Sequence, residues 1–249
     1  MQGYNVAIMN GFDLLSSEAE QYLNLSLTID QVSRLSQFAG LLVEWNQKIS
    51  LTAIRSEEDI RIKHILDSLS CQLVMEGTSV DRVIDIGSGA GFPGIPLKVL
   101  FPEMQLSLVE SVNKKTQFLS LIVQELDLNK VEIFPERAEI IGQQVDHRES
   151  YDWAVARAVA GLPVLCEYLL PLVKIGGYML AQKGETAPSE LEQAQSAIEV
   201  LGGQAAKSIP VDLPGVSQPR YLVVIQKVRP TPEKYPRRPG MPSKRPIGS

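Results

Sequence analysis

The chain has 249 residues, of which 44% are hydrophobic and 21% are charged, and its formal net charge is −5. This length permits one substantial core with an appendage, or two small domains. The composition is that of an ordinary globular protein, and its apolar runs are too short to cross a bilayer, which excludes a membrane protein. The N-terminus lacks a basic stretch followed by an apolar one, so we expect no signal peptide and a cytoplasmic location.

Residues 12–76 have the pattern of amphipathic helices. Phe38, Leu41, Leu42 and Trp45 recur at helical spacing, and residues 60–69 repeat the pattern. Strand patterns are not evident in this part of the chain. We therefore expect residues 1–78 to form an N-terminal helical cap.

The pattern changes at residue 79, where short apolar runs begin to alternate with amphipathic stretches. Strands are expected over residues 81–86, 105–110, 131–134, 152–156, 177–182, 204–211 and 221–226. Helices are expected over residues 96–101, 114–126, 163–173 and 189–201. This alternation predicts an α/β domain over residues 79–228, with a seven-stranded, mostly parallel, Rossmann-like sheet whose last two strands are antiparallel.

Charge is unevenly distributed along the chain. Residues 218–249 contain eight Lys or Arg and one acid, a net charge of +7, so the rest of the chain carries −12. A basic segment of this kind suits contact with phosphates and equally serves as a solubilising tail. We expect residues 229–249 to be a Pro/Arg-rich arm that is loop or partly disordered, and the prolines between the cations should keep it extended.

The cysteine and histidine content argues against a disulfide or a metal site. The chain has two cysteines, Cys71 and Cys166, and two histidines, His64 and His147. Both cysteines lie in apolar-periodic stretches, so buried thiols in a reducing compartment explain them best. We expect no bound metal.

A glycine-rich turn follows the first strand, in the sequence DIGSGAGFPG of residues 85–94. Gly87, Gly89 and Gly91 alternate, which lets the backbone turn sharply and approach a ligand closely. Parallel sheets bind ligands at the carboxyl ends of their strands. The acid Asp85, two residues before the first glycine, suits the sulfonium and ammonium of S-adenosylmethionine and would repel a pyrophosphate. The turn therefore favours S-adenosylmethionine over NAD, and a purely structural turn remains the other interpretation.

Two further carboxylates follow the next strands. Glu110 closes the second strand, where a carboxylate can accept hydrogen bonds from ribose hydroxyls, although an exposed surface glutamate is the alternative. Ala138 and Glu139 follow the third strand, where adenine would lie. A small residue leaves room for the ring, and backbone or carboxylate groups can bond its edge, unless Glu139 simply faces solvent at a helix start.

The fourth strand ends in Ala156-Arg157-Ala158 and lacks the Asn/Asp-Pro-Pro-aromatic motif of many enzymes that methylate exocyclic amines. The two cysteines do not lie in a loop that would expose a thiolate nucleophile. Guanine N7 carries an unprotonated lone pair and needs no general base, only alignment with the methyl group. The absence of an acid/base pair is consistent with N7 transfer, and we assign no catalytic residue.

Taken together, these residues resemble the small-subunit ribosomal RNA guanine-N7 methyltransferases, a family formerly called glucose-inhibited division protein B. The matching stretches are Trp45–Ile54, His64–Leu69, Asp85–Leu97, Ala156–Ala158 and Lys234–Pro242. The resemblance runs from about residue 38 to the end. It implies a class I S-adenosylmethionine-dependent methyltransferase whose substrate is a guanine in the 530 loop of 16S ribosomal RNA, in the small subunit or its precursor. A small-molecule methyltransferase and a non-catalytic S-adenosylmethionine-binding module remain alternatives.

The resemblance also implies particular site residues. Together with the turn, the expected cofactor contacts are Asp85, Gly87, Gly89, Phe92, Glu110, Ser111, Val112, Ala138, Glu139 and Arg157. Phe92 and Glu110 stand where some relatives have Leu and Asp, which preserves an apolar wall and a ribose acceptor. Arg157 can contact the cofactor, guide the base or be structural.

Other residues are candidates for the pocket and for RNA. Asn46, His64, Asp67, Ser68 and Lys183 are candidates for the pocket lining, and His64 is equally compatible with an ordinary helix-face histidine. The expected RNA contacts are Arg237, Arg238, Lys244 and Arg245.

Overall fold

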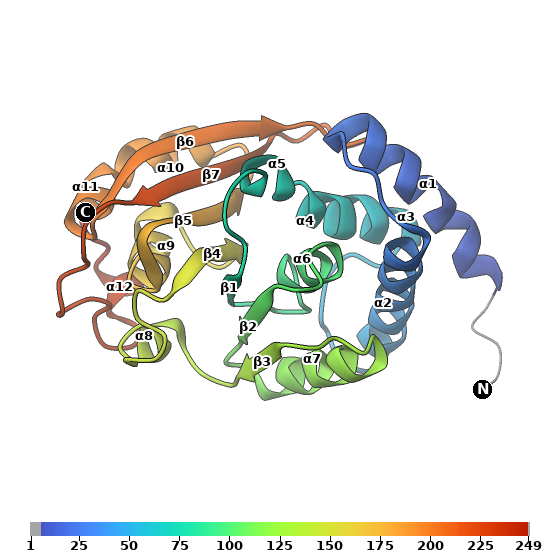
Figure 1. The fold of residues 1–249 in the computed structure, drawn as a ribbon, viewed down its shortest axis with the longest axis horizontal. Helices are drawn as coiled ribbons and strands as arrows, with labels where there is room; N and C mark the ends of the chain where they lie inside the picture. Colours follow the sequence, from blue (N-terminus) through green and yellow to red (C-terminus); the bar gives the residue numbers. More distant parts are fainter. Residues whose placement is uncertain (1–5, 249) are drawn as a thin grey trace.

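The computed structural model describes residues 6–248 and places a seven-stranded sheet between two helical layers (Figure 1). The strands are β1 (Arg82–Ile86), β2 (Gln105–Val109), β3 (Val131–Phe134), β4 (Tyr151–Arg157), β5 (Val173–Lys183), β6 (Gly203–Val211) and β7 (Arg220–Lys227). Their order is β3-β2-β1-β4-β5-β7-β6. The first five strands pair in parallel, and β7 runs antiparallel to both of its neighbours. The expected mostly parallel sheet is confirmed.

The helices divide between the two faces of the sheet. One face carries α1 (Val6–Leu23), α2 (Ile29–Lys48), α3 (Glu57–Ile60), the π-helix η1 (Arg61–Leu66), α4 (Asp67–Leu69), α5 (Gln72–Met75), α6 (Gly94–Leu100) and α7 (Asn113–Glu125). The other face carries α8 (Ala138–Ile141), α9 (Leu162–Leu169), α10 (Ala187–Gln193), α11 (Gln195–Val200) and α12 (Met241–Lys244).

Alternation along the strands gives each face its own core. In β1, Val83 belongs to the core under the N-terminal helices, whereas Ile84 and Ile86 belong to the core under α9. Phe12 and Phe38, from α1 and α2, are buried in the first of these cores. The N-terminal helices are therefore packed on the sheet and share its core.

The N-terminal region is not helical throughout, because α2 ends before residue 49. The side chain of Asn46 terminates it: Nδ2 donates to the carbonyl of Thr52, and Oδ1 accepts from the N–H groups of Leu51 and Thr52. These bonds satisfy the backbone of an extended segment that leads to η1. Asn46 thus shapes the chain at this turn.

Two predicted helices have different bounds. The helix expected over residues 163–173 ends at Leu169, because Val173 already pairs with Tyr151 in the sheet. The helix expected over residues 189–201 is instead two short helices, α10 and α11.

The C-terminal segment, residues 229–248, folds back onto α8 and α9 (Figure 1). Arg148 donates to the carbonyls of Thr231 and Tyr235. Arg237 forms a bidentate pair with Glu167, at Nη2–Oε2 2.6 Å and Nε–Oε1 2.9 Å. Glu167 is fully buried in α9 and needs a cationic partner. The segment is loop apart from α12, as expected, but the expectation of an extended arm is wrong, because the carboxylate buried in α9 binds one of its cations.

We predict that Arg237→Gln lowers the free energy of unfolding by about 2–3 kcal/mol, because it leaves the Glu167 carboxylate buried with weaker partners. Arg238→Gln is the matched control. Arg238 is exposed, so the change is expected to stay within about 0.5 kcal/mol. Urea unfolding of the two variants measures the difference, and equal stabilities would contradict the structural role of Arg237.

Candidate functional site

The glycine turn between β1 and α6 has a backbone that requires glycine. Gly87, Gly89 and Gly91 have φ values of 70°, 59° and 96°. A Cβ on Gly87 would lie 2.6 Å from Cγ2 of Val159, so the turn is pressed against the segment after β4. A Cβ on Gly89 would meet no atom closer than 3.8 Å. The tip of the turn therefore faces open space, while its base is tightly packed.

Asp85 lies under this turn and is fully buried. Its Oδ2 accepts a hydrogen bond of 3.0 Å from the backbone N–H of Gly94, whereas no described residue donates to Oδ1. Burial raises the pKa of this carboxyl to about 7. A cation placed nearby would lower that pKa and stabilise the carboxylate.

Glu110 follows β2 and faces the same turn. Its Oε2 accepts from the N–H of Gly89 at 3.0 Å, and its Oε1 accepts from the N–H of Val112 at 2.8 Å. An ionised carboxylate accepts about four hydrogen bonds, so two acceptor positions remain for hydroxyl donors. The next residues are Ser111, which is exposed, and Val112, whose apolar side chain is 47% exposed. The structure thus places an acceptor and an open apolar surface side by side.

Ala138 and Glu139 form the first turn of α8. Glu139 is buried, and its Oε1 accepts from the N–H of Gly240 at 2.8 Å. The interpretation in which Glu139 faces solvent is wrong, because the C-terminal segment covers it. The Glu139 carboxylate therefore fixes the C-terminal segment against α8.

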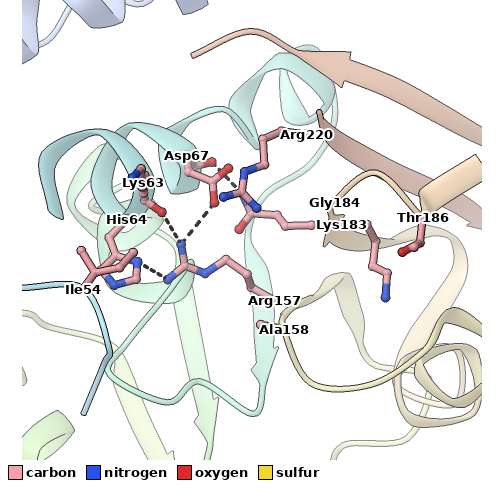
Figure 2. A pocket seen from close by; sticks show the side chains of 11 residues that line it. Ile54, Lys63, His64, Asp67, Arg157, Ala158, Lys183, Gly184, Thr186 and Arg220 are labelled. Atoms are coloured by element: carbon pink, nitrogen blue, oxygen red, sulfur yellow. Dashed lines mark hydrogen bonds and ion pairs between the residues drawn. The ribbon is translucent and has the colours of Figure 1, made fainter. Parts of the chain in front are cut away.

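Arg157, at the end of β4, connects the sheet to η1 (Figure 2). Its guanidinium donates to the carbonyl of Lys63 at 3.1 Å, to Oδ2 of Asp67 at 3.2 Å and to Nδ1 of His64 at 3.0 Å. The guanidinium also lies 4.8 Å above the ring of Phe92, which belongs to the glycine turn. One side chain therefore holds together β4, the N-terminal helices and the turn.

His64 is a neutral, fixed part of this cluster. Because Nδ1 accepts from Arg157, Nε2 carries the proton and donates to Oγ1 of Thr52 at 2.8 Å. Burial, followed by the positive charge of Arg157, lowers the pKa of His64 to about 3. Its ring also stacks on Phe92, with ring centroids 4.5 Å apart. At neutral pH this histidine positions its neighbours and is not charged.

A cavity of about 300 Å³ opens beside Arg157 (Figure 2). Its walls are Ile54, Lys63, His64, Asp67, Arg157, Ala158, Gln182, Lys183, Gly184, Thr186 and Arg220. Of the residues expected from the sequence, His64, Asp67 and Lys183 do line it. Asn46 and Ser68 do not: Asn46 ends α2, and Oγ of Ser68 donates to the carbonyl of His64.

Sequence reasoning missed Gln182 and Arg220. The two residues lie far apart in the chain but come together because β7 is antiparallel to β5, with Gln182 opposite Leu222. The sequence predicts an antiparallel pair between the last two strands, β6 and β7, and gives no signal for the pairing of β7 with β5 that brings Gln182 and Arg220 together.

The residues that the structure describes offer neither a reactive thiolate nor a metal site. Both cysteines are buried, and burial raises the pKa of each thiol, so neither offers a ready thiolate. Among residues 6–248, no group of three His, Cys, Asp or Glu side chains is placed to hold a metal ion. Within the same range, no helix is long and apolar enough to cross a membrane.

The four cations expected to contact RNA have different environments. Arg237 is engaged with Glu167, as described above. Arg238, Lys244 and Arg245 are exposed on the C-terminal segment. The structure brings none of these four to the walls of the cavity.

Comparison with known proteins gives one consistent result. A family model described as rRNA small subunit methyltransferase G matches residues 31–212. The protein of that name from Alkaliphilus oremlandii is 49% identical over 234 residues, covering 92% of this chain and 96% of its own. The one from Alkaliphilus metalliredigens is 50% identical over 231 residues, covering 91% of this chain and 95% of its own. That from Desulforamulus reducens is 42% identical over 239 residues, covering 96% of this chain and all of its own.

Solved structures share the fold at low sequence identity. An S-adenosylmethionine-dependent O-methyltransferase from Thermotoga maritima superposes with a TM-score of 0.51 at 14% identity, covering 77% of this chain and 72% of its own. TrmN from Thermus thermophilus also gives a TM-score of 0.51, at 17% identity, covering 66% of this chain and 48% of its own. These likenesses establish a Rossmann-like methyltransferase fold.

Proposed function

Because the chain belongs to the rRNA small subunit methyltransferase G family, we propose that it transfers the methyl group of S-adenosylmethionine to N7 of a guanine in the 530 loop of 16S ribosomal RNA. The substrate is the small ribosomal subunit or its precursor, and the reaction takes place in the cytoplasm. One observation carries the proposal: an open glycine turn lies between Asp85 and Glu110, and Arg157 joins it to a polar cavity.

The residues around the turn fit the cofactor. The space over Gly89 admits a ligand close to the backbone, and Glu110 has two acceptor positions left for the ribose hydroxyls. Val112 offers an apolar surface for adenine, and Asp85 gains from a nearby positive charge. The proposed contacts are Asp85, Gly87, Gly89, Phe92, Glu110, Ser111, Val112, Ala138, Glu139 and Arg157. Phe92 and Arg157 close the wall against the cavity, where they also stack on each other.

Once bound, S-adenosylmethionine supplies a methyl group made electrophilic by the positive sulfur. Guanine N7 has a free lone pair, so no proton has to be removed before transfer. The task of the protein is therefore to bind the base, to orient N7 in line with the methyl group and to exclude water. The neutral state of His64 agrees with this, because a proton donor or acceptor is not required there.

The proposal is tested by incubating the protein with isotopically labelled S-adenosylmethionine and small subunits that lack the modification. Mass-spectrometric mapping of the 16S RNA should find the label at a guanine N7 in the 530 loop. Label at another atom would overturn the assignment. Transfer to free metabolites but not to RNA would indicate a small-molecule methyltransferase, and cofactor binding without any turnover a non-catalytic module.

We predict that Gly89→Val weakens binding of S-adenosylmethionine at least tenfold, because the added side chain enters the space reserved for the ligand. Gly215→Val is the matched control. Gly215 has a similar φ of 68° and open surroundings, but lies outside the site. Both variants incur similar backbone strain, about 1–2 kcal/mol, so calorimetric titration separates strain from ligand exclusion. Equal affinities in the two variants would contradict this position for the cofactor.

The exposed cations Arg238, Lys244 and Arg245 are proposed to contact RNA phosphates. Arg237 is left out of the test because its replacement would disturb the fold. Replacing the other three with Gln should lower the slope of log affinity against log salt by about 2, at roughly 0.7 per phosphate contact. Filter binding to small subunits at several salt concentrations measures this slope, and an unchanged slope would remove the C-terminal segment from the RNA interface.

A further inference from the structure

Two polar atoms in the cavity walls have no partner within the described part of the chain. Gln182 is 6% exposed, and its Nε2 donates to the carbonyl of Asp67 at 2.6 Å, while its Oε1 is buried without a donor. The Nε of Arg220 is likewise buried without an acceptor. An unsatisfied buried polar group costs about 1–3 kcal/mol. The pair is thus suited to a ligand that offers one donor and one acceptor.

The two groups lie on one face of the sheet together with Arg157. Gln182 pairs with Arg157 in the register between β4 and β5. Side chains alternate along a strand, and the neighbours two residues away, Val155, Leu180 and Leu222, all belong to the core under the N-terminal helices. Arg157, Gln182 and Arg220 therefore point to that same side, where all three line the cavity. Figure 2 shows Arg157 and Arg220 there.

The cavity adjoins the proposed cofactor site. Arg157 lines the cavity and stacks on Phe92 of the glycine turn. The cavity volume, about 300 Å³, is at the lower end of the range for small-molecule sites and suits a single base. When N7 of a purine faces the glycine turn, its Watson–Crick edge points away from the turn and toward the far wall.

We infer that this cavity holds the target guanine and that Gln182 determines specificity for it. Oε1 of Gln182 accepts from the N1–H group of the base, and the Nε–H of Arg220 donates to O6. Enzymes that modify a base commonly read that edge after taking the base out of the stack. Adenine presents a lone pair at N1 and an amino group in place of O6, so it would face both protein groups with the wrong polarity. The inference rests on the proposed function, because it presupposes transfer to N7.

The test compares small subunits reconstituted with guanine or adenine at the target position. The wild-type protein should prefer guanine, and Gln182→Met should lower the ratio of kcat/KM for guanine to that for adenine about tenfold, the equivalent of one lost base contact. The ratio does not depend on how much of the variant is folded. Gln226→Met is the matched control, because Gln226 lies at the other end of β7 and bonds Tyr178. That variant should keep the wild-type ratio.

A second measurement needs no variant. Inosine lacks the amino group of guanine but keeps N1–H, O6 and N7, so wild-type protein should methylate a subunit carrying inosine about as well as one carrying guanine. An unchanged guanine-to-adenine ratio in Gln182→Met, or a tenfold loss of transfer to inosine, would overturn the inference. In both cases the proposed function would stand, since wild-type protein still methylates guanine N7. Absence of transfer to any guanine by wild-type protein would instead refute the proposed function.

Discussion

The guanidinium of Arg157 is the interaction on which the geometry of the site depends. It is bonded to η1 through the Lys63 carbonyl and His64, to α4 through Asp67, and it stacks on Phe92 of the glycine turn. This largely buried guanidinium is stable there because it donates hydrogen bonds to an oxygen or nitrogen of each of the first three groups and lies over the aromatic ring of the fourth. The same contacts hold His64 neutral and in one tautomer. The wall between the glycine turn and the cavity is therefore one connected unit.

Apolar contacts also join the N-terminal helices to the part of the chain that carries the sheet. Phe38 of α2 packs against Phe92, with ring centroids 5.0 Å apart, and Phe118 of α7 lies beyond it. The helices thus supply one wall of the cavity and also bury the apolar face of the sheet. A sheet without them would expose this face and lose Asp67 and His64 from the site.

Much of this arrangement could be predicted from the sequence, because it follows from local patterns. The strands, the glycine turn and the carboxylates at the strand ends are all encoded by apolar periodicity and by residues close in the chain. The partners of long-range polar groups were not predictable in this way. Glu167 lies in an apolar helix with no local sign that Arg237 would neutralise it, and Gln182 meets Arg220 only once β7 has paired with β5. Pairwise contacts of this kind depend on tertiary packing, which a single sequence does not display.

The C-terminal segment has one more consequence, for the helices on the far face of the sheet. Gly240 donates its N–H to Glu139 of α8, and Tyr168 of α9 bonds Ser243. The segment therefore clamps two short helices that have few other contacts with each other. Any change that displaces it would remove the backbone donor of the Glu139 carboxylate and loosen α8 against α9.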